Sequence, residues 1–156
     1  MSAGRPKGNH MKPTRLFLVY LSLFVVALIW NGILHLLLLA DLDATVRHLY
    51  RADLSERMAL PLLLTAGVVG VFLWGYVRFV PTRSAREGAL YGIYFAFVAG
   101  LLVDFNQYIL YPIPGHVAAA WFFGGLAEFT IYGVVLSRLV PARSGHAAMF
   151  EEHQVA

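Results

Sequence analysis

The chain has 156 residues, of which 59% are hydrophobic and 13% are charged, whereas about 25% of residues are charged in a typical soluble domain. It contains no cysteine, which excludes disulfides, iron–sulfur clusters, thiolate metal sites and thiol nucleophiles. The formal net charge is +3, but the basic residues are spread over loops and termini. We therefore interpret the basicity as a membrane topology signal and expect no nucleic-acid partner.

Four apolar stretches dominate the chain, and each is long enough to cross a bilayer, which takes about 20 residues. They comprise Leu16–Ala40, Met58–Val80, Gly88–Leu110 and His116–Val140. The stretches are apolar on nearly every face and lack the polar stripe of helices in soluble bundles. The sequence predicts an all-α, polytopic integral membrane protein, with four transmembrane helices in an antiparallel bundle at residues 16–140. Residues 1–15 and 141–156 form the N-terminal and C-terminal tails.

The first stretch is interpreted as a retained helix, because the apolar region of a secretion signal is only about 7–15 residues long. It leads into an acidic loop in which Leu42 and Val46 share one helical face. This pattern predicts a short amphipathic helix lying flat in the membrane interface. Asp43, Arg47 and Arg51 are spaced along it for i,i+4 ion pairs.

The connections and charges together predict the orientation of the bundle. The turn at residues 81–84 and the uncharged reversal at Tyr111–Gly115 are short, so the third helix lies antiparallel to its neighbours. Most of the 12 Lys and Arg lie in the N-terminal tail, around the 81–84 turn and at the C-terminal end. Loops rich in these residues stay in the cytoplasm. We expect a multi-pass protein of the inner (cytoplasmic) membrane with both termini cytoplasmic.

Small residues recur at intervals of four on two of the predicted helices. The third helix carries Gly88, Gly92, Ala96 and Gly100, and the fourth carries Ala120 and Gly124. Lipid provides no hydrophobic drive for helix association, so close approach through small residues becomes a main attraction. We expect the third helix to pack tightly along this stripe, either within the chain or in a homo-oligomer.

Polar residues lie within the apolar stretches on three of the predicted helices. They are Asn31 and His35 on the first, Asp104 and Gln107 on the third, and Glu128 and Tyr132 on the fourth. A charge near the bilayer centre costs roughly 2.5–3.5 kcal/mol on insertion scales, so such groups normally face the bundle interior. We expect these six residues to meet in the outer half of the bundle.

Three functions remain open from this pattern. The cluster could bind or conduct a proton, a cation or a small polar ligand. Alternatively, it could fix only the register of an accessory or scaffold subunit within a larger membrane complex. The third hypothesis is an electron-transfer anchor in which His35 and His116 bind haem b. No cofactor is otherwise predicted, no metal-ligand spacing is visible, and no catalytic motif indicates an enzyme.

The chain resembles a group of small, uncharacterised four-helix bacterial inner-membrane proteins. The similarity rests on Trp30, the run His48–Tyr50, the run Arg86–Gly92, Asp104 with Tyr108, and Pro114. In that group the acidic residue of the fourth helix precedes Trp-Gly, whereas Glu128 here precedes Phe129 and Thr130. The resemblance implies the same four-helix fold and, because the group has no established activity, no function.

Overall fold

The computed structural model describes residues 11–82 and 84–141, and in this part every regular element is helical. The elements in chain order are α1 (Pro13–Ile33), the π-helical turn η1 (Leu34–Leu38), α2 (Ala40–Val46), the 3-10 turns η2 (Arg47–Leu49) and η3 (Leu54–Arg57), α3 (Ala59–Phe79), α4 (Ala85–Gly100), the π-helical turn η4 (Leu101–Phe105), α5 (Asn106–Leu110) and α6 (Gly115–Leu139).

Several of these elements join into four long helical rods. They run over Pro13–Leu38, Ala59–Phe79, Ala85–Leu110 and Gly115–Leu139, and each is long and apolar enough to cross a membrane. The prediction of an all-helical chain with four such helices is therefore confirmed. The rods differ from the predicted stretches by only a few residues at their ends, because apolar composition does not mark the first and last helical turns.

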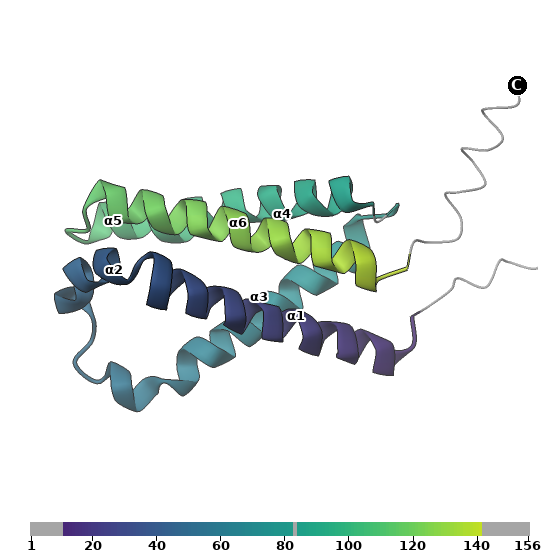
Figure 1. Ribbon diagram of the computed structural model, residues 1–156, viewed down its shortest axis with the longest axis horizontal. Coiled ribbons are helices and arrows are strands. Elements are labelled where there is room, and N and C mark those ends of the chain that lie inside the picture. The colour runs from purple at the N-terminus through teal and green to yellow at the C-terminus, as the bar shows by residue number, and fades with distance from the viewer. Residues whose placement is uncertain (1–10, 83, 142–156) are drawn as a thin grey trace, which may run out of the picture.

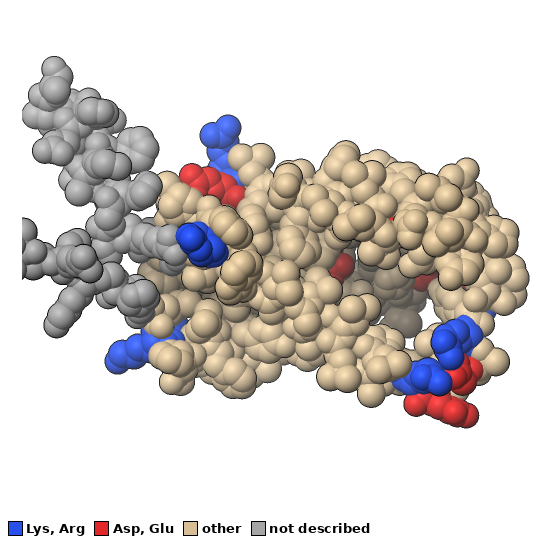
Figure 2. Space-filling view, turned by 180° about the vertical axis from the view of Figure 1, so that it is seen from behind, with Lys and Arg blue, Asp and Glu red and all other residues tan. Residues whose placement is uncertain are grey.

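The rods are antiparallel in sequence order, so the connections gather at two opposite ends (Figure 1). The start of α1, the α3–α4 turn and the end of α6 lie at one end. The opposite end, called the α2 end below, holds α2, the two 3-10 turns and the α5–α6 reversal. Charged side chains cluster at both ends, and the face between them is almost entirely uncharged (Figure 2).

Helices α4 and α6 form the closest pair in the bundle. A Cβ atom added at Gly88 would overlap the backbone of Gly133, and one added at Gly92 would overlap the backbone of Phe129. A Cβ at Gly100 would overlap the ring of Phe122. The small residues of α4 thus let the two helix backbones touch, which strengthens their dispersion contacts.

The small residues predicted on α6 meet a different neighbour. A Cβ atom added at Gly124 would lie 2.7 Å from the side chain of Leu34, at the junction of α1 and η1. Gly124 is therefore the contact point for the first rod, whereas Gly133 is the contact point for α4. The sequence analysis missed Gly133, because its spacing does not continue the Ala120–Gly124 row.

Helix α3 packs on the bundle through one half of its length only. Phe72, Leu73 and Tyr76 are buried in the main core with Leu23 and Tyr132. The opposite half is exposed, and its leucines have large exposed fractions: Leu60, Leu62, Leu63 and Leu64. Figure 1 shows α3 crossing α1 obliquely, so that its first turns diverge from α4 and α6 towards the α2 end.

The loop after α1 differs from its predicted ion pairing. Asp43 bonds to His35 and Trp121, while Arg47 remains exposed. The helix ends at Val46, so Arg51 lies beyond the helical register that i,i+4 pairing requires. Hydrogen bonds from Arg51 and from Arg57 instead hold the pKa of Asp53 below its usual value. The expected Asp43–Arg47–Arg51 series is therefore wrong.

Candidate functional site

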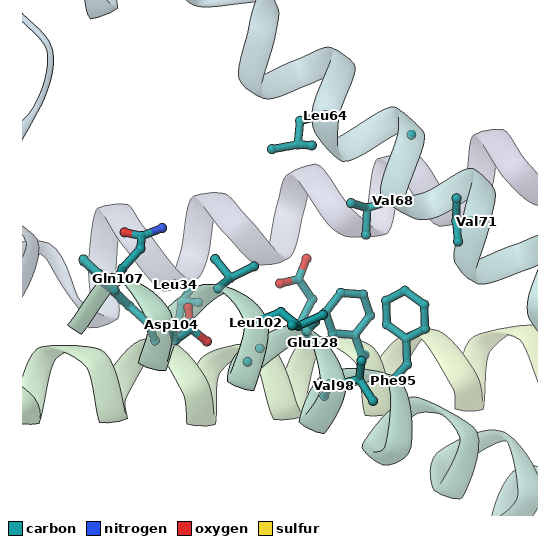
Figure 3. Close-up of a pocket in the computed structure, with 18 of the residues that line it drawn as sticks. Leu34, Leu64, Val68, Val71, Phe95, Val98, Leu102, Asp104, Gln107 and Glu128 are labelled. Atoms are coloured by element: carbon teal, nitrogen blue, oxygen red, sulfur yellow. The ribbon is translucent and has the colours of Figure 1, made fainter. Parts of the chain in front are cut away.

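A cleft of about 840 Å³ lies between the diverging half of α3 and the α4–η4 segment, with α6 at its base. Leu64, Val68 and Val71 line the α3 side, and Figure 3 shows them facing Phe95 and Leu102 across the cleft. The surface seen in Figure 2 is hollowed, with acidic atoms visible in the hollow. The cleft therefore combines apolar walls with two half-buried acidic side chains, Asp104 and Glu128.

Two glycines help to keep this space open. Gly67 of α3 and Gly125 of α6 both line the cleft, and a Cβ atom added at either would meet no atom within 4 Å. These positions differ from Gly88 and Gly133, where the absent side chain makes room for a packed backbone. At Gly67 and Gly125 the space left by glycine belongs to the cleft.

Two π-helical turns border the cleft near its α2 end. Leu34 and His35 belong to η1, and Leu102 and Asp104 belong to η4. A π-helical turn contains an extra residue and redirects the side chains around it, and such turns are frequent at functional sites. Regular helix is thus interrupted on two sides of the cleft, at the places where polar residues line it.

Glu128 lies at the base of the cleft and accepts hydrogen bonds from α1 and from a residue of its own helix, α6. Its Oε1 accepts a hydrogen bond of 2.8 Å from Nδ2 of Asn31 and another from the hydroxyl of Tyr132. The same Asn31 amide also donates to the carbonyl of Ala27 at 3.0 Å. Within the described residues Oε2 of Glu128 accepts no hydrogen bond. One oxygen thus ties α1 to α6 and the other is free to meet a ligand.

Asp104 and Gln107 line the same cleft nearer the α2 end. Within the part of the chain that the structure describes, neither side chain makes a hydrogen bond or ion pair. Because Gly92 of α4 lies against Phe129 of α6, Glu128 is level with the middle of α4. A rise of 1.5 Å per residue then puts the backbone of Asp104 roughly 17 Å from that level, but its Oδ2 turns back towards Glu128 and lies 3.4 Å from a Cβ built at Gly100. His35, which lines the same cleft, interacts electrostatically with both Asp104 and Glu128.

Asp43 is a polar residue of this region that the sequence analysis did not include. Its Oδ2 lies 2.8 Å from Nδ1 of His35, and its Oδ1 accepts a hydrogen bond of 2.8 Å from Nε1 of Trp121. These contacts fasten α2 to η1 and α6 where His35 and Trp121 line the cleft. The spacing of eight residues would separate His35 and Asp43 by about 12 Å on a continuous helix, so it gave no signal of this pair. The contact forms because the chain departs from helix at Leu39, between η1 and α2.

A second hollow of about 570 Å³ adjoins the cleft at the α2 end. Tyr50, Gln107 and Trp121 line both spaces, so the two are continuous there. Burial raises the pKa of the Tyr50 phenol, and nearby Asp43 adds to this effect. Tyr50 therefore stays neutral and adds no charge to this approach to the cleft.

The proposed haem ligands do not share this space. His116 is exposed in the first turn of α6 and does not line the cleft, while Nδ1 of His35 is occupied by Asp43. Among the described residues there is also no group of three or more His, Asp and Glu that could hold a metal ion. The cleft thus offers paired carboxylates and an amide, with His35 at its edge.

The comparisons with known proteins add no relative to this geometry. No protein-family model matches the sequence, and neither a curated protein nor a solved structure matches it. The function must therefore be argued from the residues of the cleft themselves.

Proposed function

We propose that this protein is a membrane-embedded cation-binding bundle, and that its ligand sits in the cleft beside Asp104. In this proposal the four long helices cross the inner membrane, both termini are cytoplasmic and the α2 end faces outward. The observation that carries the proposal is the pair of carboxylates, Asp104 and Glu128, in one cleft whose described lining contains no Lys or Arg.

A carboxylate at membrane depth needs a partner that compensates its charge. Its charge costs several kcal/mol unless a proton, water or a cation accompanies it. Glu128 has part of this compensation from Asn31 and Tyr132. Asp104 has no hydrogen bond or ion pair among the described residues and has only an electrostatic interaction with His35, and this makes it the stronger candidate for holding a cation. Gln107, one helical turn away, offers a carbonyl oxygen as a further neutral ligand.

The position of the two carboxylates also suggests a path. The hollow lined by Tyr50, Gln107 and Trp121 joins the cleft at the α2 end, so a ligand from outside would meet Asp104 first. Glu128 lies deeper, with one oxygen unoccupied by hydrogen bonds. A cation or proton bound at Asp104 could then pass to Glu128, provided the bundle relaxes between the two positions.

The proposal can be tested with tetramethylammonium as a simple monovalent cation. The protein is placed in phosphatidylglycerol nanodiscs, whose lipid headgroup carries no competing ammonium, and its thermal unfolding midpoint is followed. At a tenfold excess over the dissociation constant, binding contributes about 1.4 kcal/mol, or about 3–6 °C for a chain of this size. We expect this rise in wild type and its loss in Asp104→Asn, with a smaller rise in Glu128→Gln.

The matched control is Asp41→Asn, which removes an exposed carboxylate that does not line the cleft. This variant should respond to tetramethylammonium as wild type does. An equal response of wild type, Asp104→Asn and Glu128→Gln would refute the cation site.

A second candidate function is favoured by the hydrogen bonds of Glu128. Because they join α1 to α6, they would suit an accessory subunit in which the polar residues serve only to fix the bundle. In that case Asp104→Asn would not change how the unfolding midpoint responds to tetramethylammonium. Purification in mild detergent would retain a stoichiometric partner protein.

A further inference from the structure

We infer that the natural ligand of the cleft is a single-chain amphiphilic cation, an ammonium group with an alkyl tail, which enters sideways from the lipid between α3 and α4. This inference rests on the cation site proposed above and specifies the ligand class. It depends on four features of the cleft: its walls, its charge, its size and its opening.

The walls are more apolar than a site for a hydrated ion requires. Leucine, valine and phenylalanine side chains line both sides, and the polar groups are confined to the base and to the α2 end. A small hydrated cation would leave these walls in contact with water. An alkyl chain would bury them, at roughly 25 cal/mol for each Å² of apolar surface removed from water.

The charge of the cleft selects the headgroup. Asp104 is the carboxylate without a hydrogen-bond partner among the described residues, and it stands beside Gln107 at the α2 end of the cleft. No Lys or Arg accompanies it in the described lining, and Nδ1 of His35 is already taken by Asp43, so an anionic or phosphate headgroup would meet a like charge. An ammonium group would meet a carboxylate in a weakly solvated setting, where ion pairing is stronger than in water.

The size of the cleft excludes a bare ion as a complete occupant. A volume of about 840 Å³ lies in the range of pockets that enclose drug-sized ligands. The apolar lining continues from Leu102, near Asp104, to Val71 and Phe95 deeper in the bundle. A headgroup at Asp104 would therefore have its tail alongside these residues, parallel to the surrounding lipid chains.

The opening of the cleft faces sideways. Its two walls belong to neighbouring rods, and the first half of α3 diverges from α4 with its leucines exposed (Figure 1). The hollow in Figure 2 accordingly lies on the uncharged face between the charged ends. In a membrane this face contacts acyl chains, so a tail can enter without crossing a charged or hydrated surface.

The test compares tetramethylammonium with dodecyltrimethylammonium, which has the same headgroup and an added alkyl chain. Both are titrated against the protein in phosphatidylglycerol nanodiscs, and the concentration giving half of the maximal rise in unfolding midpoint is measured. We expect the alkyl chain to lower this concentration at least tenfold in wild type. Asp104→Asn should lose the response to both probes, and dodecanoate, with the same chain length and a negative headgroup, should give no rise.

Variants that fill the cleft distinguish binding of the alkyl chain in the site from simple partitioning of the probe into lipid. Gly67→Leu and Gly125→Leu place a side chain in the open space of the cleft, and should reduce the gain from the alkyl chain to less than threefold. Gly32→Leu is the matched control, because a Cβ there also meets no atom within 4 Å but Gly32 does not line the cleft. This control should keep the full gain.

Each outcome of this experiment has one meaning. If neither probe stabilises wild type, the cation site and the amphiphile inference both fail. If tetramethylammonium stabilises it but the alkyl chain lowers the half-maximal concentration less than tenfold, the cation site stands and the amphiphile inference is wrong. An equal chain-length gain in Gly67→Leu, Gly125→Leu and Gly32→Leu would also overturn the inference, because the chain would then bind outside the cleft.

Discussion

Oε1 of Glu128 illustrates how a single acceptor can join distant parts of this chain. It accepts hydrogen bonds from Asn31, far away in sequence, and from Tyr132, one helical turn along α6. Interhelical hydrogen bonds in membrane proteins average about 0.6 kcal/mol, with a maximum near 1.7 kcal/mol. The hydroxyl of Tyr132 is buried, so its removal leaves the carboxylate short of a donor that water cannot readily replace.

Tyr132→Phe should therefore lower the free energy of unfolding by about 1 kcal/mol, towards the upper part of that range. Reversible unfolding in mixed detergent micelles, followed by circular dichroism, measures the change. Tyr94→Phe provides the control, because Tyr94 is 70% exposed and its hydroxyl makes no hydrogen bond within the described residues. Equal stability of the two variants would mean that the Tyr132–Glu128 bond contributes nothing.

Sequence reasoning identified Asn31, Glu128 and Tyr132 because ionisable and amide groups are conspicuous in apolar stretches. It paired Asp43 wrongly, because it continued an ideal helix through the outer loop. In the structure α2 ends at Val46, and Asp43 bonds to His35 and Trp121 instead. Where a helix ends and which distant donor reaches a carboxylate are decided by packing, which the spacing of residues alone does not contain.

At the scale of elements, the α4–α6 pair depends on glycines whose hydrogens touch a neighbouring backbone. A Cβ added at Gly88 would overlap the carbonyl group of Gly133, and the reverse substitution would meet the carbonyl group of Gly88. Backbone cannot move aside as a side-chain end can, so any larger residue must push the two helices apart.

Gly88→Ala tests this contact, because alanine favours helix by about 1 kcal/mol while overpacking costs about 1–3 kcal/mol. We expect a net loss of about 1 kcal/mol in the free energy of unfolding. Gly32→Ala should have the opposite effect and raise the free energy of unfolding by up to about 1 kcal/mol, because its new methyl group meets no atom within 4 Å. Chemical unfolding of both variants under one condition gives the comparison, and a gain in Gly88→Ala would contradict the close contact.

The spacing of small residues on α4 indicated a packing stripe but not its partner. Gly88 and Gly92 lie against Gly133 and Phe129 of α6, whereas the Gly124 position of α6 receives Leu34. The π-helical turns η1 and η4 were also not predicted, since neither contains a proline or glycine that would mark an irregular helix. A π-helical turn changes which side chains face a neighbour before and after it. The need for such a change arises only when the helices are packed in the bundle.

At the scale of the whole molecule, the two charged ends and the uncharged face between them are consistent with a bundle that crosses a membrane. Around the α3–α4 turn, three basic residues (Arg78, Arg83 and Arg86) are accompanied by one acidic residue, Glu87, whereas the three basic residues of the 41–57 loop are accompanied by four acidic ones. This asymmetry is the basis for the proposed cytoplasmic termini.

The absence of cysteine from the sequence makes the orientation directly testable. Ala52 lies in the loop at the α2 end and Ala85 begins α4 at the other end, and both are exposed. In intact cells a membrane-impermeant maleimide should label Ala52→Cys, whereas Ala85→Cys should react only after the membrane is permeabilised. Labelling of Ala85→Cys alone in intact cells would reverse the proposed topology.

The sequence by itself determined that the chain is helical, that four segments can cross a membrane, and which polar groups lie within them. These properties follow from the length and composition of the apolar segments, which are local features of the sequence. Once water is excluded, such a segment has few alternatives to a helix. The tertiary structure alone decided that Asp104 and Glu128 share one cleft and that Glu128 binds Asn31. It also decided that α3 diverges from α4, because helix crossing angles depend on how particular side chains fit between neighbouring backbones.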